Sequence, residues 1–436
     1  MKYLFPLSLL CVASSSFAYS TSVPQTETQK IINCGQLLDI KAGTWREKVS
    51  ITVENGSVKS IGAYSQDAKA IDLKSYSCLP GLIDMHVHLT GETQAQVDQL
   101  RDTLTADVAD QAYRSVELAE KTLYAGFTTV RDLGSEAGLN VSLKRAINNG
   151  RVIGPRMFTS GKAIATTGGH ADPSNGFSMK LRDAIGKPGP EGGVINGVES
   201  AREAVRSRYQ EGADLIKITA TGGVLSQAAS GQNAQFSDEE LRSIVATAKD
   251  YGFRVAAHAH GAEGMKRALR AGVDSIEHGS MMDDEAIALF KKMNAYYVPA
   301  ISAGNYVAEK AKDPNYYSPT VRPKAAAIGP LIKATFGKAY KAGVKIAFGT
   351  DAGVFPHGEN AKEFELMVAA GIPALEAIRT ATLNAADLLN QNQRLGSIEA
   401  NYAADIIAVK GDPLKNITLL QKVEFVMKEG VVYKKP

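Results

Sequence analysis

Apolar strand-like runs alternate with amphipathic helical runs along most of the chain, from residue 79 to residue 390. The clearest strand candidates are 126–130, 215–218, 255–258, 275–278 and 345–348. Helical runs over 238–249 and 261–271 separate the later ones. Strands that alternate with helices form βαβ units, which build a parallel sheet covered by helices. The alternation therefore restricts the chain to the α/β class.

Two α/β architectures satisfy this alternation, a (β/α)₈ TIM-like barrel and an open, doubly wound sheet. The segment 79–390 is long enough for a barrel with insertions. A dinucleotide-binding sheet would carry a glycine-rich fingerprint after its first strand, and the sequence has none there. We therefore expect the barrel and keep the open sheet as the alternative.

Both ends of the chain are rich in short β-type runs and differ from the segment between them. Near the start, Asn55-Gly56 is a hairpin signal between two such runs. The strand candidates at the two ends are 31–32, 50–53, 58–61, 404–409, 423–426 and 431–433. We therefore expect terminal β segments at 19–78 and 391–436, on either side of the segment 79–390.

Residues 1–18 differ from the rest of the chain in composition. A short positively charged start, an apolar run over 4–12 and the small residues around Ala18 are typical of a secretory signal peptide. The apolar run is too short to span a bilayer, and the residues before Cys11 do not fit a lipid-attachment site. We expect cleavage after Ala18, export to the periplasm or the extracellular space, and no membrane anchor.

Two cysteines, Cys34 and Cys78, remain after this cleavage. Exported proteins meet an oxidising compartment, where a pair of cysteines can form a disulfide. Both residues flank the N-terminal β-rich segment. We therefore predict a disulfide that pins this segment next to the start of the barrel.

Most of the histidines lie at or just beyond the ends of predicted strands. The chain has seven of them, at positions 86, 88, 170, 258, 260, 278 and 357. His86 and His88 are two residues apart in a strand-like run, so both imidazoles can face the same side. Because barrel active sites form at the carboxyl ends of the strands, this placement predicts a site there.

The side chains at these strand ends fit a divalent metal ion. His258 ends one apolar run, and His278 ends the next one twenty residues later, which is the spacing of consecutive barrel strands. Asp351 follows the run 346–350 and adds a carboxylate. Four histidines and a carboxylate suit zinc or a similar divalent ion. We therefore predict a metal site formed by His86, His88, His258, His278 and Asp351.

The motif from Pro80 to His88, the strand-end His258 and His278, and Gly349-Thr350-Asp351 together resemble the amidohydrolase superfamily. The chain is most similar to the binuclear, metal-dependent branch that contains prolidase-like dipeptidases, Xaa-Arg/Lys carboxypeptidases and ochratoxin-hydrolysing amidases. This resemblance implies a (β/α)₈ barrel joined to a small β-sandwich domain, which both chain ends build. The β-rich ends agree with that expectation.

The resemblance also implies two divalent metal ions, with zinc favoured, and a carboxylated lysine between them. Lys217 falls at the position of that lysine, and an ordinary buried ammonium there would repel the metals. The implied first site combines His86, His88, the Lys217 carbamate and Asp351. The implied second site combines Lys217, His258 and His278. A surface lysine at a strand end is the structural alternative for Lys217.

Other polar residues near the predicted site have less defined roles. His170, on a glycine-rich loop, and His260, two residues after His258, are candidate substrate-binding residues, with loop and packing roles as alternatives. Arg131-Asp132 could receive a substrate carboxylate, although an internal ion pair is favoured. His357 resembles part of a loop motif of the same branch and has no assigned role.

The predicted activity is hydrolysis of a carboxamide by a metal-activated hydroxide, with Asp351 moving the proton. The favoured substrate is a small molecule or short peptide, namely a peptide or an N-acyl amino acid cleaved as by a dipeptidase or carboxypeptidase. A cyclic amide or imide hydrolase is the first alternative, and a non-catalytic periplasmic binding protein is the second.

The overall charge bears on binding partners. The 49 basic and 46 acidic residues nearly cancel, which gives no electrostatic footprint for nucleic acid. We therefore expect no nucleic-acid partner. The sequence leaves the oligomeric state open, a homo-oligomer included.

Overall fold

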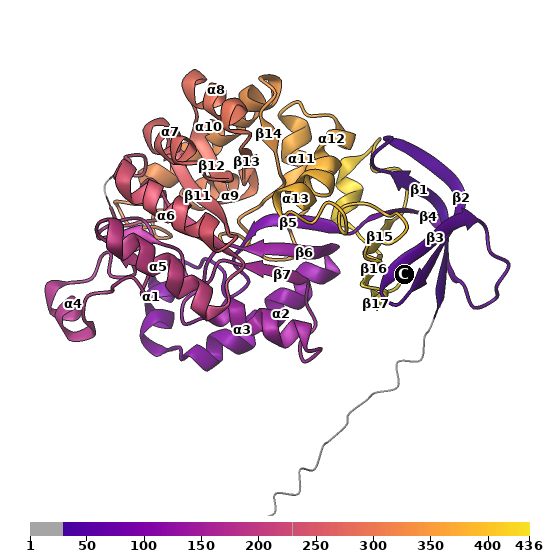
Figure 1. Cartoon of the computed structure of the whole chain (residues 1–436), viewed down its shortest axis with the longest axis horizontal. Coiled ribbons are helices and arrows are strands. Elements are labelled where there is room, and N and C mark those ends of the chain that lie inside the picture. Colours follow the sequence, from indigo (N-terminus) through magenta and orange to yellow (C-terminus); the bar gives the residue numbers. More distant parts are fainter. Residues whose placement is uncertain (1–28, 229) are drawn as a thin grey trace, which may run out of the picture.

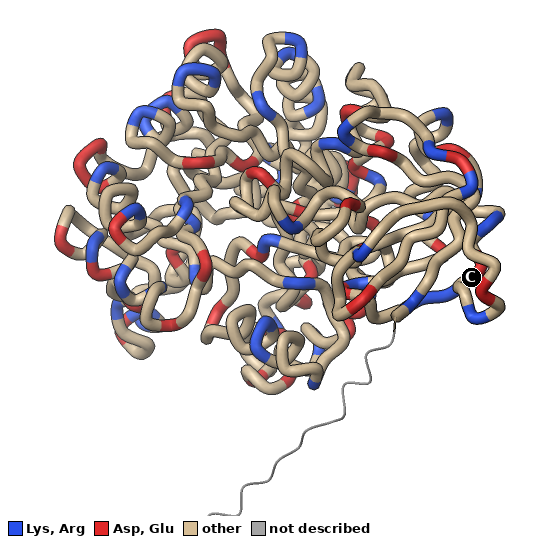
Figure 2. Tube along the Cα trace, turned by 45° about the vertical axis from the view of Figure 1, so that its right-hand side comes forward, with Lys and Arg blue, Asp and Glu red and all other residues tan. Residues whose placement is uncertain are grey.

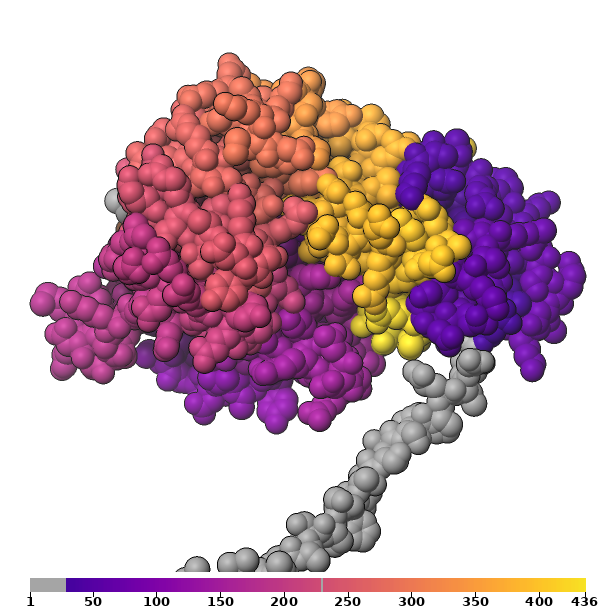
Figure 3. All heavy atoms as spheres, in the orientation of Figure 1, coloured from indigo at the N-terminus to yellow at the C-terminus, as the bar shows by residue number. Residues whose placement is uncertain are grey.

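The computed structural model describes residues 29–228 and 230–436. The signal peptide predicted for residues 1–18, with its cleavage after Ala18, lies outside the described residues. Figure 1 shows a smaller β-rich part beside a larger part in which helices surround strands. In Figure 3 the C-terminal residues lie between the N-terminal strands and the larger part, so both chain ends belong to the smaller one.

The smaller part contains a seven-stranded sheet in the order β17-β16-β15-β4-β1-β2-β3. Its strands are β1 (Lys30–Asp39), β2 (Thr44–Glu54), β3 (Ser57–Ala63), β4 (Ile71–Pro80), β15 (Ile406–Val409), β16 (Phe425–Lys428) and β17 (Val431–Lys434). β4 joins the two chain ends, because it pairs parallel with β1 and antiparallel with β15. The strands predicted at both ends therefore share one sheet, and a two-layered sandwich stays a prediction.

The β2–β3 hairpin turns at Asn55-Gly56, as the sequence predicts. Glu54 pairs with Ser57 across the turn, and both turn residues have positive φ, 50° at Asn55 and 77° at Gly56. These are the left-handed conformations of a tight two-residue hairpin turn, which Asn and Gly adopt most readily.

Alternate residues of this sheet pack into two different cores. On β4, Leu79 belongs to the large core that contains Phe127, whereas its neighbour Cys78 belongs to a separate cluster with Ile406 and Phe425. Successive side chains of a strand point to opposite faces. One face of the sheet therefore packs against the larger part of the molecule and holds the two parts together.

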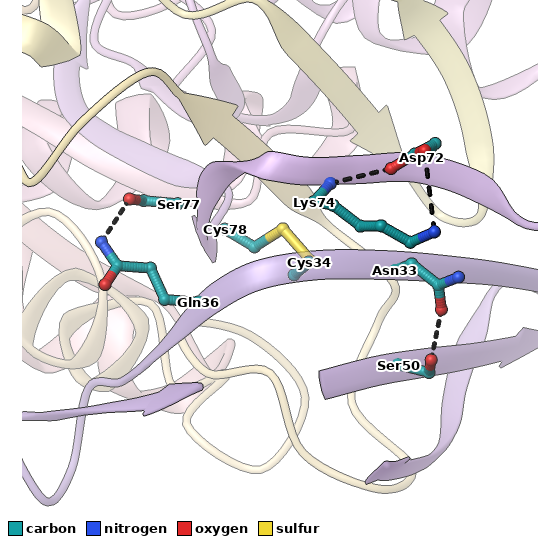
Figure 4. The surroundings of a disulfide bond; sticks show 8 residues. All are labelled: Asn33, Cys34, Gln36, Ser50, Asp72, Lys74, Ser77 and Cys78. Atoms are coloured by element: carbon teal, nitrogen blue, oxygen red, sulfur yellow. Dashed lines mark hydrogen bonds and ion pairs between the residues drawn. A yellow bond between two sulfur atoms is a disulfide. The ribbon is translucent and has the colours of Figure 1, made fainter. Parts of the chain in front are cut away.

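The predicted disulfide between Cys34 and Cys78 is confirmed (Figure 4). It joins the adjacent strands β1 and β4, with 6.1 Å between the two Cα atoms. Next to it, the Gln36 amide donates a hydrogen bond to the Ser77 hydroxyl at 2.6 Å, which ties the same two strands. The disulfide therefore joins the N-terminal segment to β4, the strand that leads into the larger part.

The larger part is built on parallel strands, which confirms the α/β class. Three of them form the sheet β5-β6-β7 and five form the sheet β10-β11-β12-β13-β14. They are β5 (Leu82–Val87), β6 (Phe127–Asp132), β7 (Arg156–Thr159), β10 (Leu215–Thr219), β11 (Arg254–Gly261), β12 (Ser275–Met281), β13 (Tyr296–Val298) and β14 (Lys345–Ile346). A short parallel pair, β8 (Ala165–Thr166) and β9 (Val194–Ile195), lies between the two groups in sequence.

Helices cover these strands (Figure 1). They are α1 (Gln96–Thr105), α2 (Val108–Tyr124), α3 (Leu139–Asn148), α4 (Met179–Ile185), α5 (Val198–Glu211), α6 (Asp238–Asp250), α7 (Ala262–Ala271), α8 (Asp284–Met293), α9 (Ile301–Lys310), α10 (Arg322–Lys341), α11 (Lys362–Ala369), α12 (Ala374–Thr380), α13 (Leu383–Leu388) and a short 3₁₀ helix (Ile417–Gln421). α6 and α7 match the two helical runs that the sequence predicts. Among the described residues, no helix is both long enough and apolar enough to cross a bilayer.

Charged residues of both signs are interspersed over the molecule (Figure 2). Many of them pair locally, such as Arg267 with Glu263 and Arg270 with Glu285, at 2.9 Å and 2.6 Å. Exposed pairs of this kind contribute little to stability. The charge pattern therefore gives no strongly single-signed face in that view.

Loss of the disulfide is expected to destabilise the fold without abolishing it. A double substitution, Cys34→Ala with Cys78→Ala, should lower the free energy of unfolding by about 2–4 kcal/mol, because the unfolded chain regains the freedom of the closed loop. Denaturant unfolding measures this difference. A reductant should destabilise the wild type by a similar amount and leave the variant unchanged, and equal stability of both proteins would contradict the prediction.

Candidate metal centre

All eight predicted site residues line one cavity of about 200 Å³. They are His86, His88, His170, Lys217, His258, His260, His278 and Asp351. They lie on the parallel strands β5, β10, β11 and β12 or in the loops that follow β5, β8 and β14. Parallel strands end at one side of their sheet, and this geometry brings residues far apart in sequence to one place.

Three of these residues form a compact group of potential metal ligands. One ligand atom from each of His86, His278 and Asp351 lies within 4.8 Å of the others, and all three residues are buried. Asp351 Oδ1 is 3.3 Å from His86 Nε2 and 3.3 Å from His88 Nε2. Although burial opposes its ionisation, the neighbouring His86 and His88 hold the pKa of Asp351 well below its usual range.

The polar contacts around this group fit a divalent metal ion. Asp351 Oδ1 is buried and makes no hydrogen bond. His88 Nδ1 lies 2.9 Å from the Gly134 carbonyl oxygen, and His86 Nδ1 lies 3.1 Å from Glu277 Oε2. Metal-binding histidines commonly engage the ring nitrogen away from the metal in this way. The Nε2 atoms of both histidines thus lie beside the same Asp351 oxygen.

Lys217 is buried beside the same group, so the alternative of a surface lysine is wrong. The residue is 4% exposed, on β10, and its Nζ lies 3.4 Å from His86 Nε2. Burial lowers the pKa of Lys217 to about 8. Desolvation thus increases the fraction of neutral amine at this position.

The other histidines extend the group along the cavity. The ring centroid of His258 is 4.8 Å from that of His278 and 4.4 Å from that of His170. Burial lowers the pKa of His170 to about 4, and its Nδ1 is buried without a hydrogen-bond partner. His260 Nδ1 lies 2.8 Å from the Ser280 hydroxyl. Neutral imidazoles, which can bind a metal or accept a proton, therefore line this side of the cavity.

Glu277 also belongs to the site, although it was not predicted from the sequence. The fully buried Glu277 contacts His86 through Oε2, and its Oε1 forms an ion pair with Arg131 at 2.8 Å. Although burial opposes ionisation, Arg131 and His86 lower the pKa of Glu277 to about 2. The favoured internal ion pair of Arg131 is thus present, with Glu277 and not with Asp132 as its partner. Polar residues at alternate positions of a strand buried on both faces, Ser275 and Glu277, are the signal that could have identified it.

Asp84 fixes the chain around the candidate ligands. Its carboxylate accepts hydrogen bonds from the Thr350 hydroxyl at 2.6 Å, from the Asn360 amide at 2.8 Å and from the His86 backbone N–H at 3.1 Å. Burial nevertheless raises the pKa of Asp84 to about 6. This side chain therefore connects β5 with the segment that ends in Asp351.

Two of the candidate ligands have unusual backbone conformations. φ is 69° at His278 and 59° at Asp351, the left-handed region that residues with a Cβ seldom adopt. Such conformations cluster at functional sites, where the surrounding structure must enforce them. Here the Asp351 N–H donates to the His86 carbonyl oxygen at 2.7 Å, which holds the turn against β5.

His357, which has no role assigned from the sequence, lies behind the centre. Its Nε2 is 3.1 Å from the His88 carbonyl oxygen, and its Nδ1 is 3.3 Å from the Thr122 hydroxyl. The residue is buried and does not line the cavity. His357 therefore contacts the backbone of His88 and does not face the space where a substrate would bind.

Comparisons with known proteins agree with this geometry. Residues 78–433 match the model of the amidohydrolase family. The chain is 35% identical over 374 residues to the ochratoxinase of Aspergillus niger, a match that covers 82% of this chain and 76% of that protein.

Solved structures give the same result. One is a crystal structure of a Xaa-Pro dipeptidase with methionine bound in its active site, at 50% identity and a TM-score of 0.90, covering 93% of this chain and 100% of that one. Another is a prolidase complexed with N-methylphosphonate-L-proline, at 31% identity and a TM-score of 0.84, covering 94% and 100%.

Removal of the Lys217 side chain is expected to empty the candidate centre. Lys217→Ala should lower the metal content of purified protein and almost abolish activity, because it removes the lysine whose carbamate is expected to bridge two metal ions. Small carboxylates that can replace this anion should restore part of the activity. Elemental analysis measures the metal, and Lys345→Ala, at an exposed strand lysine, is the matched control. Full metal content and near-normal turnover in Lys217→Ala would contradict the prediction.

Proposed function

Because the chain belongs to the amidohydrolase family, we propose that it is a metal-dependent hydrolase of amide or peptide bonds. The observation that carries this proposal is the single cavity in which all eight predicted site residues meet. A non-catalytic binding protein would not need the compact group of His86, His278 and Asp351 at its base. The hydrolase is therefore favoured over that alternative.

The residues proposed to hold two divalent ions are His86, His88, His258, His278 and Asp351, together with a carboxylated Lys217. Divalent ions bound there would polarise the scissile carbonyl and lower the pKa of the attacking water. The buried position of Lys217 supports carboxylation, because burial favours the neutral amine that reacts with carbon dioxide. The carbamate would add a negative charge to a site that otherwise contains mainly imidazoles and divalent cations.

The side chains of the cavity have distinct proposed tasks in the reaction. Asp351, with a buried oxygen that makes no hydrogen bond, takes the proton of the attacking water and returns it to the leaving nitrogen. His170, whose Nδ1 is buried without a partner, orients the substrate carbonyl. Glu277 and Arg131 hold His86 in place from behind.

We propose a peptide or an N-acyl amino acid with a free carboxylate as the substrate. Apolar side chains form much of the cavity wall, among them Leu133, Val224, Leu225, Val307 and Ile332. They suit an apolar part of such a substrate. The relative with methionine in its active site supports a product of this class.

A cyclic amide hydrolase is the second candidate. An imidazolonepropionase of Clostridium tetani is 24% identical over 446 residues, covering 89% of this chain and 91% of that protein. A substrate panel distinguishes hydrolysis of linear amides from hydrolysis of cyclic amides. It contains dipeptides, N-acyl amino acids and hydantoin-like rings, each incubated with metal-loaded protein. Release of free amino acids from the linear substrates alone is the expected result, and turnover of the rings alone would contradict the proposal.

The surrounding architecture is proposed to be a closed (β/α)₈ barrel. Two sets of backbone hydrogen bonds support closure. Between β5 and the chain after β14, Met85 N–H donates to Phe348 O at 2.9 Å. Near β7 and β10, Asp214 N–H donates to Thr159 O at 2.7 Å, and Ile164 N–H donates to Lys217 O at 2.9 Å.

Export to the periplasm or the extracellular space is also proposed. The Cys34–Cys78 disulfide supports it, because such bonds persist mainly in oxidising compartments. Expression of the full chain, followed by fractionation and N-terminal sequencing, tests export and cleavage after Ala18.

Asp351→Asn is expected to separate metal binding from proton transfer. Asparagine keeps an oxygen ligand of similar size but cannot take up a proton at neutral pH. The variant should retain much of its metal and lose about 10²–10⁴-fold in turnover per bound metal. Steady-state kinetics with parallel metal analysis measures this ratio. Equal turnover per bound metal in both proteins would remove the proton-transfer role.

A further inference from the structure

A second cavity, of about 570 Å³, adjoins the candidate metal centre. The two cavities share Val224, His260 and Ile328 as lining residues. The second one lies between the loop that follows β10 and the first turns of α10, and its lining includes the apolar Met281 and Leu331. The two cavities therefore meet at these three residues.

Lys324, on α10, is the charged residue of this second cavity. Among the described residues that line it, no carboxylate is present. Lys324 also forms no ion pair with any described carboxylate, unlike Lys338 farther along the same helix, which pairs with Asp284 at 2.8 Å. The cavity thus combines an apolar wall with one positive charge that is not neutralised.

The contacts of Lys324 orient its ammonium group without neutralising it. Nζ donates to the carbonyl oxygens of Ser226 and Ala228 at 2.7 Å each, and to that of Gly223 at 3.3 Å. Carbonyl groups accept hydrogen bonds but carry no net charge. Partial burial lowers the pKa of Lys324 because it disfavours the charged form. An anion would relieve that cost.

The same contacts place the ammonium close to the metal centre. Gly223, whose carbonyl oxygen is 3.3 Å from Lys324 Nζ, packs directly on the His170 ring. A Cβ at Gly223 would lie only 2.1 Å from His170 Cε1. One residue therefore separates the Lys324 charge from a side chain of the first cavity.

We propose that the second cavity is a subsite for the amino-acid half of the substrate, in which Lys324 binds the free carboxylate. The carboxylate replaces the long contact to the Gly223 carbonyl, and the apolar wall accepts the side chain. This inference rests on the proposed amide hydrolysis and adds to it the residue that recognises the carboxylate of the substrate. Lys324 thereby selects against substrates with a neutral C-terminus.

Two substrates with the same scissile bond test this role. N-acetyl-L-methionine carries the carboxylate, and N-acetyl-L-methionine amide lacks it. Lys324→Gln keeps a donor for the loop carbonyls and removes the charge. It should raise KM for the acid roughly 10- to 100-fold, the usual effect of losing a hydrogen bond to a charged group, with little change in kcat. The amide should be unaffected, Lys324→Arg should retain the preference, and Lys338→Gln is the matched control on the same helix.

The outcomes separate a binding role from a structural one. An equal loss on both substrates would show that Lys324 only holds the loop, and unchanged kinetics would show no role; either result overturns the proposal. Calorimetry with L-methionine and L-methioninamide repeats the comparison without turnover. Tighter binding of the acid by the wild type, lost in Lys324→Gln, supports the subsite even if neither amide is hydrolysed, and no such difference overturns it.

Discussion

The buried ion pair between Arg131 and Glu277 is the interaction on which the candidate site depends. It spans β6 and β12, and Arg131 also donates to the Met85 carbonyl oxygen on β5 at 2.6 Å. The second carboxylate oxygen of Glu277 faces His86. Loss of one partner from a buried pair leaves an uncompensated charge, at a cost of about 3–5 kcal/mol. Three strands and one candidate ligand are therefore fixed relative to one another by a single pair.

The low pKa values of the buried histidines explain how the chain tolerates so many of them in one cluster. Burial lowers the pKa values of His86 and His260 to about 4 and about 3, so these two imidazoles are neutral near pH 7. Neutral rings do not repel one another, and each can offer a lone pair. The left-handed backbone at His278 and Asp351 adds a local cost. A bound cation would offset the cost of this backbone conformation and the cost of burying the polar groups, because it attracts the carboxylate and accepts the lone pairs of the imidazoles.

Much of the fold and the location of the centre could be predicted from the sequence, because both follow from local patterns. The Asn55-Gly56 turn follows from local turn chemistry, and the placement of His258 and His278 on neighbouring parallel strands follows from the periodicity of the side chains, although β11 and β12 run on to Gly261 and Met281. Glu277 could not be assigned in this way. Its partner Arg131 lies 146 residues away in the chain, and only packing of the strands shows that they meet. The same holds for Asp84, whose partners Thr350 and Asn360 belong to a distant loop.

Substrate selection depends on a different part of the structure from the chemistry. The candidate ligands lie on the parallel strands or just after them, where the backbone of the sheet fixes their positions. The cavity walls beyond them come from α9, α10 and the loop after β10. Lys324 contacts that loop across 101 residues of sequence, a relation that no local pattern encodes. Changes in the helices and the loop can therefore alter which amide binds without disturbing the group that cleaves it. For this reason the reaction class can be inferred from the sequence more readily than the substrate.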